Sequence, residues 1–420
     1  MSTLVGHPTH GLLEHFVFPS QRPNDKILCV DAHKKLYVLA KSRYSFPAGS
    51  FHVAPGLTYL ADSFYDYENP WHGLNAISPF FSWRRERGQC QNPMRFMLFK
   101  RGDVVVKKVG NWVRGLMEAN LDRRVTINDN ELLTKGFNGG SGNKSTMVCF
   151  ERAVVMRRGL GGMKGNNRQR LFDMVRCKAW RFCGVDHDVD GKDGDRLSNN
   201  NGAATSTDAS AVRVQVSLLL REGKRGFANE TQVRDVIRRE CSKLASKCEL
   251  RVIHLASAGG NANRSNTSFC NQVRSMRKTD IVVTTHGGQL TNMVFMPPGS
   301  SVMEMFPTGW LEGAGSGQFI YLWFAGWSRM HYENAWRDPH GIRCPYPNFA
   351  SSSTSSTSNN KSDITNMMKR CFAIRQKNQK VGVDEVYLAR WISKVLAKAI
   401  IRKVKLNLNT TTITPKCACD

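Results

Sequence analysis

The sequence predicts an α/β protein whose second half contains a parallel, doubly wound sheet. Three apolar segments rich in β-branched residues predict buried strands at residues 212–220, 249–255 and 280–285. Two segments between them predict helices, at residues 231–246 and 269–278. Strands that alternate with helices in this way form a parallel sheet that is covered by helices on both faces.

The first 185 residues form a separate N-terminal domain in this interpretation. The expected elements are strands at residues 26–30, 35–40, 95–99 and 102–106, a helix at 110–119 and a buried strand at 146–155. Residues 186–211 are acidic, polar and low in complexity, which indicates a linker between two domains. The second domain is expected to span residues 212–346.

The acidic linker contains two incomplete metal-binding patterns. An EF-hand loop that starts at Asp186 has Leu197 where a bidentate glutamate is required. Asp186 and Asp188 form a D-x-D pattern, but the strand expected before it is weak. We therefore favour a solvated linker without a metal site. A single metal-dependent domain built on Asp186 and Asp188 is the competing architecture.

The C-terminal part predicts a loop followed by a helix. Residues 347–382 include a Ser/Thr/Asn-rich insertion and predict a low-complexity loop and connector. Residues 383–406 predict a basic amphipathic helix with one apolar face. We expect this helix to pack across both domains, with a membrane-surface role as the alternative.

The chain of 420 residues is strongly basic, with a formal net charge of +26. Its hydrophobic content of 41% is sufficient for real cores, so a disordered chain is excluded. The charge favours polyanionic partners, and a basic nucleic-acid-binding protein without catalytic activity is one alternative. The sequence contains no recognisable nucleic-acid-binding module. A basic surface on an enzyme that binds a nucleotide diphosphate is the interpretation that we favour.

Twelve cysteines occur without a CxxC pair and without a Cys/His cluster at zinc spacing. Their even number fits a secretory-pathway protein with several disulfides, which Cys417 and Cys419 could join, although a cytosolic protein with free thiols stays open. The first 18 residues contain neither a cleavable signal nor an apolar run near the ~20 residues of a membrane span. We expect a fragment that lacks its anchor; a misassigned start or a soluble protein are the alternatives.

A glycine turn follows the strand at residues 280–285. His286-Gly287-Gly288 turns the chain, residues 289–296 predict about two helical turns, and residues 301–306 predict another buried strand. A glycine turn that opens a helix presents free backbone N–H groups and the positive helix end, which together hold a phosphate. The alternative is a tight turn that needs glycine for steric reasons alone.

The same segment resembles a known family. His286-Gly-Gly-Gln-Leu-Thr-Asn292, followed by Pro297-Pro298-Gly299 and Glu304, is similar to the HGAGLTN…PPG…E segment of glycosyltransferase family 61. Members transfer xylose, arabinose or N-acetylglucosamine from UDP-sugars to glycans or to O-linked sugars on proteins. The chain departs from the family at Gly288-Gln289, where Ala-Gly is usual, so a side chain stands at the turn.

The resemblance implies a GT-B architecture, in which two Rossmann-like domains face each other across a cleft. The N-terminal domain would bind the acceptor, a glycan or glycoprotein, and the second domain the UDP-sugar donor. The expected reaction is an inverting transfer without a metal or another cofactor, and nucleic acid is not an expected partner. The expected location is the Golgi or endoplasmic reticulum lumen, with membrane association only through an anchor that this sequence does not contain.

The residues that match the family assign candidate roles in donor binding. Arg221 and Arg225 follow a strand and match family arginines; guanidinium groups bind diphosphates in a bidentate manner that lysine cannot copy. A solvated basic loop is the alternative. Glu304 would hydrogen-bond the ribose hydroxyls. The diphosphate would be held by the turn and the helix start, through His286, Gly287, Gly288, Leu290, Thr291 and Asn292.

The candidate catalytic base lies in the first domain. Asn69, Trp71 and His72 match an N-x-x-H motif of the family, and His72 could accept the proton of an acceptor hydroxyl. A buried His72 that holds a loop together is the alternative. Family sequences often have an acidic residue about one turn later, where this chain has Asn75 and Ala76. The possible substitutes are Asp62 and Asp66.

Overall fold

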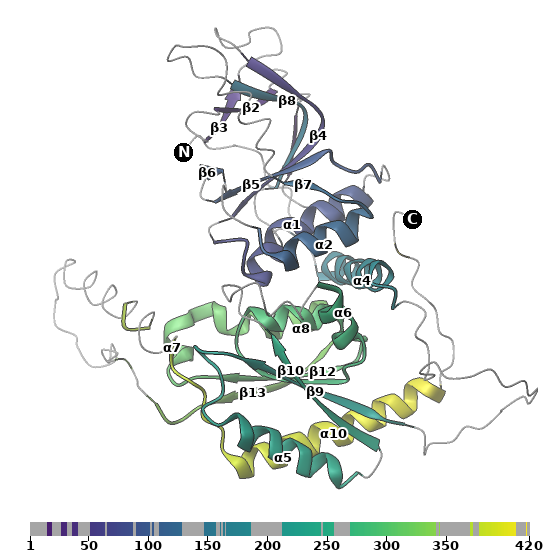
Figure 1. The fold of residues 1–420 in the computed structure, drawn as a ribbon, viewed down its shortest axis with the longest axis vertical. Helices are drawn as coiled ribbons and strands as arrows, with labels where there is room; N and C mark the ends of the chain where they lie inside the picture. Colours follow the sequence, from purple (N-terminus) through teal and green to yellow (C-terminus); the bar gives the residue numbers. More distant parts are fainter. Residues whose placement is uncertain are drawn as a thin grey trace, which may run out of the picture. The chain divides into compact units, whose positions relative to one another are not determined.

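The computed structural model confirms the α/β class with two sheet-containing units. It describes residues 15–18, 27–31, 36–40, 51–63, 65–86, 90–100, 103–104, 109–127, 147–156, 160, 163, 165–185, 212–244, 247–255, 269–341, 344, 370–372, 378–408 and 417. The chain divides into unit 1 (residues 1–183, 268–270 and 415–420) and unit 2 (residues 184–267 and 271–414). Each unit contains one sheet (Figure 1).

Unit 1 is built on a mixed sheet. Its strands are β1 (His15–Phe18), β2 (Ile27–Asp31), β3 (Leu36–Ala40), β4 (Phe51–Ser63), β5 (Arg95–Lys100), β6 (Asp103–Val104), β7 (Thr126–Ile127) and β8 (Met147–Met156). The order is β1-β8-β2-β3-β6-β5-β4, with β7 beside β5, and an additional β8–β4 pairing closes the path. Its helices are α1 (Pro70–Glu86), α2 (Asn111–Leu121) and α4 (Gly165–Phe182).

Parallel and antiparallel pairs in unit 1 follow from the lengths of the connections. β4, β5 and β7 are parallel, and the helices α1 and α2 connect them in the order β4-α1-β5-α2-β7, which is the Rossmann-like part. Residues 32–35 between β2 and β3 are too few for the crossover that a parallel pair needs, so these strands are antiparallel. The same holds for β5 and β6, which only residues 101–102 connect.

Unit 2 is the parallel, doubly wound sheet that the sequence predicts. Its strands are β9 (Val214–Arg221), β10 (Cys248–Leu255), β11 (Ile281–Thr285), β12 (Ser301–Phe306) and β13 (His331–Arg337). The order is β10-β9-β11-β12-β13, and every pair is parallel. The connecting elements are α5 (Glu230–Ser242), α6 (Phe269–Arg277), η4 (Gly288–Phe295), α7 (Trp310–Ala314), η5 (Gly315–Phe319) and α8 (Ile320–Trp327). In Figure 1, α5 lies on one face of the sheet and α6 and α8 on the other.

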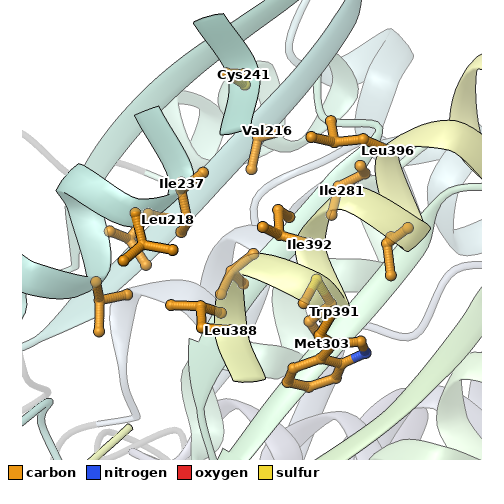
Figure 2. Close-up of a cluster of buried hydrophobic side chains, with 14 of the residues drawn as sticks. Val216, Leu218, Ile237, Cys241, Ile281, Met303, Leu388, Trp391, Ile392 and Leu396 are labelled. Atoms are coloured by element: carbon orange, nitrogen blue, oxygen red, sulfur yellow. The ribbon is translucent and has the colours of Figure 1, made fainter. Parts of the chain in front are cut away.

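The C-terminal helix α10 (Glu385–Leu408) belongs to the core of unit 2. Its side chains Leu388, Ile392 and Leu396 are at most 1% exposed and pack with Ile237 of α5 and Ile281 of β11 (Figure 2). Each such burial contributes about 1.5–3 kcal/mol. The helix therefore completes one face of the sheet of unit 2. That it packs across both domains stays a prediction.

The described cysteines are paired. Five disulfides lie within the described part of the chain: Cys29–Cys149, Cys177–Cys417, Cys183–Cys270, Cys241–Cys248 and Cys344–Cys371. The bond of Cys417 agrees with the expectation that the last cysteines join disulfides. Free thiols, the alternative left open by the sequence, do not occur among the described cysteines.

Several sequence-based expectations lie outside the described residues. The acidic segment from residue 186 to 211, with Asp186 and Asp188, is one, and residues 345–369 of the low-complexity loop are another. Among the residues that the structure describes, no group of three or more His, Cys, Asp or Glu could hold a metal ion. In the same part of the chain, the helices are too short or too polar to cross a bilayer.

Candidate functional site

The strand order of unit 2 reverses between β9 and β11, because β10 lies on the other side of β9. In doubly wound sheets, ligands bind outside the carboxyl ends of the strands at such a switch point. Arg221 is the last residue of β9, and His286 directly follows β11. The fold therefore brings together two of the residues that the sequence predicted for donor binding.

The glycine turn holds the guanidinium group of Arg221 against the backbone. Gly287 has an extended conformation (φ 167°, ψ 175°), which any residue can adopt. A Cβ atom added at Gly287 would, however, lie 2.3 Å from Oε1 of Gln289 and 2.5 Å from Nη1 of Arg221, so these two side chains would have to shift. The ends of the Gln289 and Arg221 side chains therefore lie close to the backbone of the glycine turn.

Gln289, which departs from the family motif, folds its side chain back over the end of β11. The amide Nε2 of Gln289 donates to the carbonyl oxygen of Thr285 at 2.7 Å, and Nδ2 of Asn292 donates to the carbonyl of Gln289 at 3.1 Å. The turn therefore stays closed with Gln289 in place of glycine. The segment that follows, η4, is a 3₁₀ helix and not the expected α-helix; long runs of this kind are uncommon and often mark functional segments.

Three other predicted residues build the turn from inside. Leu290, Thr291 and Asn292 are at most 1% exposed. Their side chains therefore support η4, and a ligand would meet this segment through the backbone N–H groups at its start, which have no partners within the helix. That these residues bind the diphosphate through their backbone stays a prediction.

The second arginine lies in the loop between β9 and α5. Arg225 has a left-handed backbone (φ 61°), and the residues after it are fixed by Val381, which donates to the carbonyl of Gly226 at 2.9 Å and accepts from Ala228 at 2.8 Å. The Arg225 guanidinium lies 5.3 Å from the ring centroid of Trp310, a cation–π arrangement. The loop and this ring together set the direction of Arg225.

Arg221 and Arg225 form an uncompensated cationic pair. Within the described residues neither side chain makes an ion pair, and the Nε atoms of both are buried without a hydrogen-bond partner. Burial lowers the pKa of Arg221, and burial together with the charge of Arg221 lowers the pKa of Arg225 to about 10. The hydroxyl Oγ1 of Thr285, at the end of β11, is also buried without a partner. This strand edge thus holds positive charge and unused polar groups.

His286 sits in an aromatic enclosure next to the arginines. Its ring centroid lies 4.8 Å from that of Phe306, 4.6 Å from that of Trp310 and 5.4 Å from that of Tyr321. Burial raises the pKa of Tyr321, and so does Glu304, whereas the positive charges of Arg225 and Arg221 lower it. Tyr321 thus feels both the acidic and the basic residues of the site.

Glu304 has a different position from the one expected. Its Oε1 lies 2.5 Å from Nδ1 of His286, its Oε2 accepts from the hydroxyl of Tyr332 at 2.7 Å, and the residue is 0% exposed. A carboxylate with both oxygens engaged and no exposed surface is not placed to bind ribose hydroxyls. The expected ribose contact is therefore not supported, and Glu304 instead holds His286.

The aromatic side chains of the site were the least visible in the sequence. Trp310 and Tyr321 belong to a series of aromatic residues after Glu304 that is typical of core, and their spacing gives no sign of a shared site. Tyr332 lies in β13, whose burial alternates irregularly. The contact of Tyr332 with Glu304 could have been predicted only if the register of β12 and β13 had been known.

The candidate catalytic residues His72, Asp62 and Asp66 lie in unit 1. His72 is on α1 and stacks on Tyr65 with ring centroids 4.2 Å apart. Asn69 accepts from the backbone of Trp71 at 3.1 Å, so this residue of the N-x-x-H motif caps the helix. Asp62 and Asp66 are exposed, and Asp66 accepts from the backbone of Asn69 at 3.2 Å. The catalytic role of these residues stays a prediction.

Asn75, which stands near where the family often has an acid, has a structural contact. Its Oδ1 accepts from the backbone N–H of Leu160 at 3.3 Å and so ties α1 to the segment before α4. This contact is one that an asparagine and an aspartate can make equally.

A cavity of about 630 Å³ lies at the end of the β9–α5 loop, next to Ala228 and Asn229. Trp336, Lys380 and three carboxylates line it, and the carboxylates already have partners. Asp338 accepts from Gly382 at 2.6 Å, Asp384 accepts from Tyr387 at 2.6 Å, and Glu385 pairs with Arg239 at 2.9 Å. The arginine pair offers a diphosphate more charge than this cavity does, so we place the candidate site at the arginines.

Comparisons with known proteins match part of this chain. The family model described as Glycosyltransferase 61 matches residues 148–303, which extend from β8 to β12 and include Arg221, Arg225 and His286. No curated protein matches the chain in sequence. Among solved structures, an oxidoreductase from Corynebacterium diphtheriae is 9% identical with a TM-score of 0.23, over 45% of this chain and 99% of that chain, a likeness too low to carry an argument.

Proposed function

We propose that the chain transfers a sugar from a UDP-sugar to a glycan or glycoprotein acceptor with inversion, and the match of residues 148–303 to the family model of glycosyltransferase 61 supports this proposal. The family supports the transferase activity itself; the UDP donor, the acceptor and the inverting course are the proposal. Xylose, N-acetylglucosamine and arabinose are the candidate sugars.

The observation that carries the proposal is the uncompensated arginine pair. Two partly buried guanidinium groups without a carboxylate repel each other and lose hydration, so they are unfavourable until an anion binds. A diphosphate supplies oxygens at a spacing that guanidinium groups bind in a bidentate manner. Arg221 and Arg225 thus fit the diphosphate of a nucleotide-sugar.

The location of the pair supports the same conclusion. The arginines stand at the switch point of a doubly wound sheet, next to a glycine turn that opens a helix. Backbone N–H groups at a helix start add donors for a phosphate. Neutralisation of the leaving UDP by fixed cations lowers the barrier without a metal, and we therefore propose a metal-independent transfer.

We propose His72 as the base that deprotonates the acceptor hydroxyl, with Asp62 and Asp66 as the substitutes. We also propose the lumen of the Golgi or endoplasmic reticulum as the location. The five disulfides of the described part support that location, because disulfides persist in oxidising compartments.

A panel of UDP-sugars tests the proposed function. The protein is incubated with each UDP-sugar, with and without a chelator, and released UDP and transferred sugar are measured. We expect at least one UDP-sugar to be turned over, equally with the chelator. Turnover that the chelator abolishes and Mn²⁺ restores would contradict the metal-independent course, and absence of UDP binding by calorimetry would contradict the function itself.

The same assay separates binding from chemistry. His72→Ala is expected to reduce turnover by ~10²-fold or more, the usual contribution of a positioned base, while UDP affinity stays nearly unchanged. Loss of UDP binding or of folding in His72→Ala would assign His72 a structural role and leave Asp62 and Asp66 as the next candidates for the base.

A further inference from the structure

Three neighbouring strands of unit 2 contribute to one buried chain of hydrogen bonds. Glu304 in the central strand β12 lies opposite Thr284 of β11 and Ala335 of β13. Its carboxylate reaches His286 directly after β11 at 2.5 Å and Tyr332 in β13 at 2.7 Å. The two oxygens of one carboxylate thus connect the candidate site to a residue on the next strand.

The buried carboxylate needs both partners. Glu304 is 0% exposed, and a buried carboxylate without hydrogen-bond donors is strongly unfavourable. Burial raises the pKa of Tyr332, and the charge of Glu304 raises it further, so this hydroxyl keeps its proton and donates. Since Oε2 is occupied by Tyr332, Oε1 remains for the imidazole Nδ1 of His286.

We infer that Tyr332 is a positioning residue which, through Glu304, fixes the ring of His286 with its proton on Nδ1 and leaves Nε2 to accept a hydrogen bond from a hydroxyl group of the donor sugar. The hydrogen bond at one ring nitrogen sets the role of the other, so a ring that donates from Nδ1 presents Nε2 as its acceptor when neutral. The identity of the ligand group rests on the proposed function; the tautomer does not.

The choice of a hydroxyl follows from the charges around His286. Arg221 and Arg225 offer only N–H donors, which suit phosphate oxygens. An unprotonated Nε2 repels phosphate oxygens and attracts O–H donors. The side chain of His286 is 8% exposed, so that little of the ring is open to a ligand. Within the described site, His286 therefore accepts a hydrogen bond from the sugar, and the arginines bind the diphosphate.

The tautomer is tested by NMR on the full chain with ¹⁵N-labelled histidine and without ligand. The resonances of His286 are assigned from their loss in His286→Gln. We expect the wild-type ring to carry its proton on Nδ1, and Tyr332→Phe to show a mixture of tautomers. The matched control is Tyr387→Phe, because the Tyr387 ring contacts Trp336 with ring centroids 4.6 Å apart and its hydroxyl makes no hydrogen bond within the described residues.

A wild-type ring protonated on Nε2, or a Tyr332→Phe spectrum identical to that of the wild type, would overturn the inference. Thermal melting checks that each variant folds. If Tyr332→Phe does not fold, Tyr332→Gln decides, since its amide can still donate to Glu304. The Nδ1 tautomer is expected in that variant, and another tautomer there counts against the positioning role.

Calorimetry tests the ligand group. Tyr332→Phe is expected to weaken UDP-sugar binding about 10-fold, in the range that loss of a residue behind a functional histidine causes, while UDP affinity changes less than about twofold. Equal losses for UDP and UDP-sugar would overturn the sugar contact. If the wild type binds neither, the proposed function fails, and the NMR spectrum still decides the tautomer.

Discussion

Unit 2 contains two pairs of partly buried cations, at opposite ends of its strands, and they differ in one respect. At the start of β12 and β13, Lys398 and Arg402 pair with the buried Glu333 at 2.6 Å and 3.2 Å. At the carboxyl ends, Arg221 and Arg225 have no carboxylate within the described residues. The first pair has its anion within the fold, whereas the second pair has none and, in the proposed function, receives the diphosphate of the donor.

The pKa shifts at the two ends of the strands show the same difference between a cation pair with a carboxylate and one without. Although burial raises it, hydrogen bonds from Lys398, Ser301 and Arg402 hold the pKa of Glu333 below its usual value. At the other end, burial lowers the pKa values of Arg221 and Arg225, and for Arg225 the neighbouring arginine adds to this effect. Charge is thus compensated at one end of the sheet and left uncompensated at the other.

The largest effect is expected when a carboxylate replaces one arginine of the uncompensated pair. Arg221→Glu gives Arg225 a counter-ion and places a negative charge where the diphosphate would bind. We expect UDP affinity to fall more than about 100-fold, because like charges in an interface cost several kcal/mol, while the melting temperature does not fall. Calorimetry and thermal melting measure both, and unchanged UDP affinity would show that the diphosphate binds elsewhere.

The opposite change removes the carboxylate from the compensated pair. Glu333→Gln leaves Lys398 and Arg402 without a counter-ion, and we expect a loss of ~1–3 kcal/mol in the free energy of unfolding. The loss is moderated because Lys398 is 47% exposed. UDP affinity is expected to stay unchanged. Denaturant unfolding gives the first quantity, and a large loss of UDP binding in a folded variant would contradict the division of roles.

A milder substitution tests whether the arginine geometry or only its charge is needed for binding. Arg221→Lys keeps the charge but loses the planar fork, so we expect UDP affinity to remain reduced by about 10-fold. Arg238→Lys on α5, whose side chain is 62% exposed, is the matched control and is expected to bind UDP as the wild type does. Full UDP affinity in Arg221→Lys would mean that charge alone, without bidentate geometry, holds the ligand.

The smallest expected effect is a dependence of stability on acid. The pKa of Glu333 is lower in the folded than in the unfolded chain, so its contribution is present above the unfolded value of about 4.5 and is lost as pH falls through the folded value. Between about pH 5 and pH 3, the wild type should therefore lose more unfolding free energy than Glu333→Gln, by under about 1 kcal/mol after solvent screening. Parallel curves for both proteins would contradict this assignment.

The sequence predicts unit 2 well because its elements are regular. The strand β12 spans Ser301–Phe306 as expected, and the helix α6 starts at Phe269 as expected. Apolar runs of this length predict buried strands and helices. The resemblance to the family singled out the arginines and His286, and their proximity could be predicted because the ends of parallel strands meet at one edge of the sheet. Their role in donor binding stays a prediction.

The contacts of Glu304 could not be predicted in the same way. Tyr332 is 28 residues away in sequence, and its hydroxyl reaches Glu304 only because β12 and β13 pair in a particular register with an irregularity between Val302 and Glu304. The packing of α10 on the sheet of unit 2 could not be predicted for a similar reason. An amphipathic helix shows its apolar face in the sequence, but not the partner that covers it.

The most direct test of the central claim is UDP calorimetry on Arg221→Ala beside Arg402→Ala, one arginine from each pair, with melting temperatures measured on the same samples. Loss of a charge-assisted hydrogen bond costs ~1.5–3 kcal/mol, so we predict that Arg221→Ala weakens UDP binding by roughly 10- to 100-fold without a loss of melting temperature. Arg402→Ala should lower the melting temperature and bind UDP normally. Equal effects of the two substitutions on UDP affinity would contradict the claim.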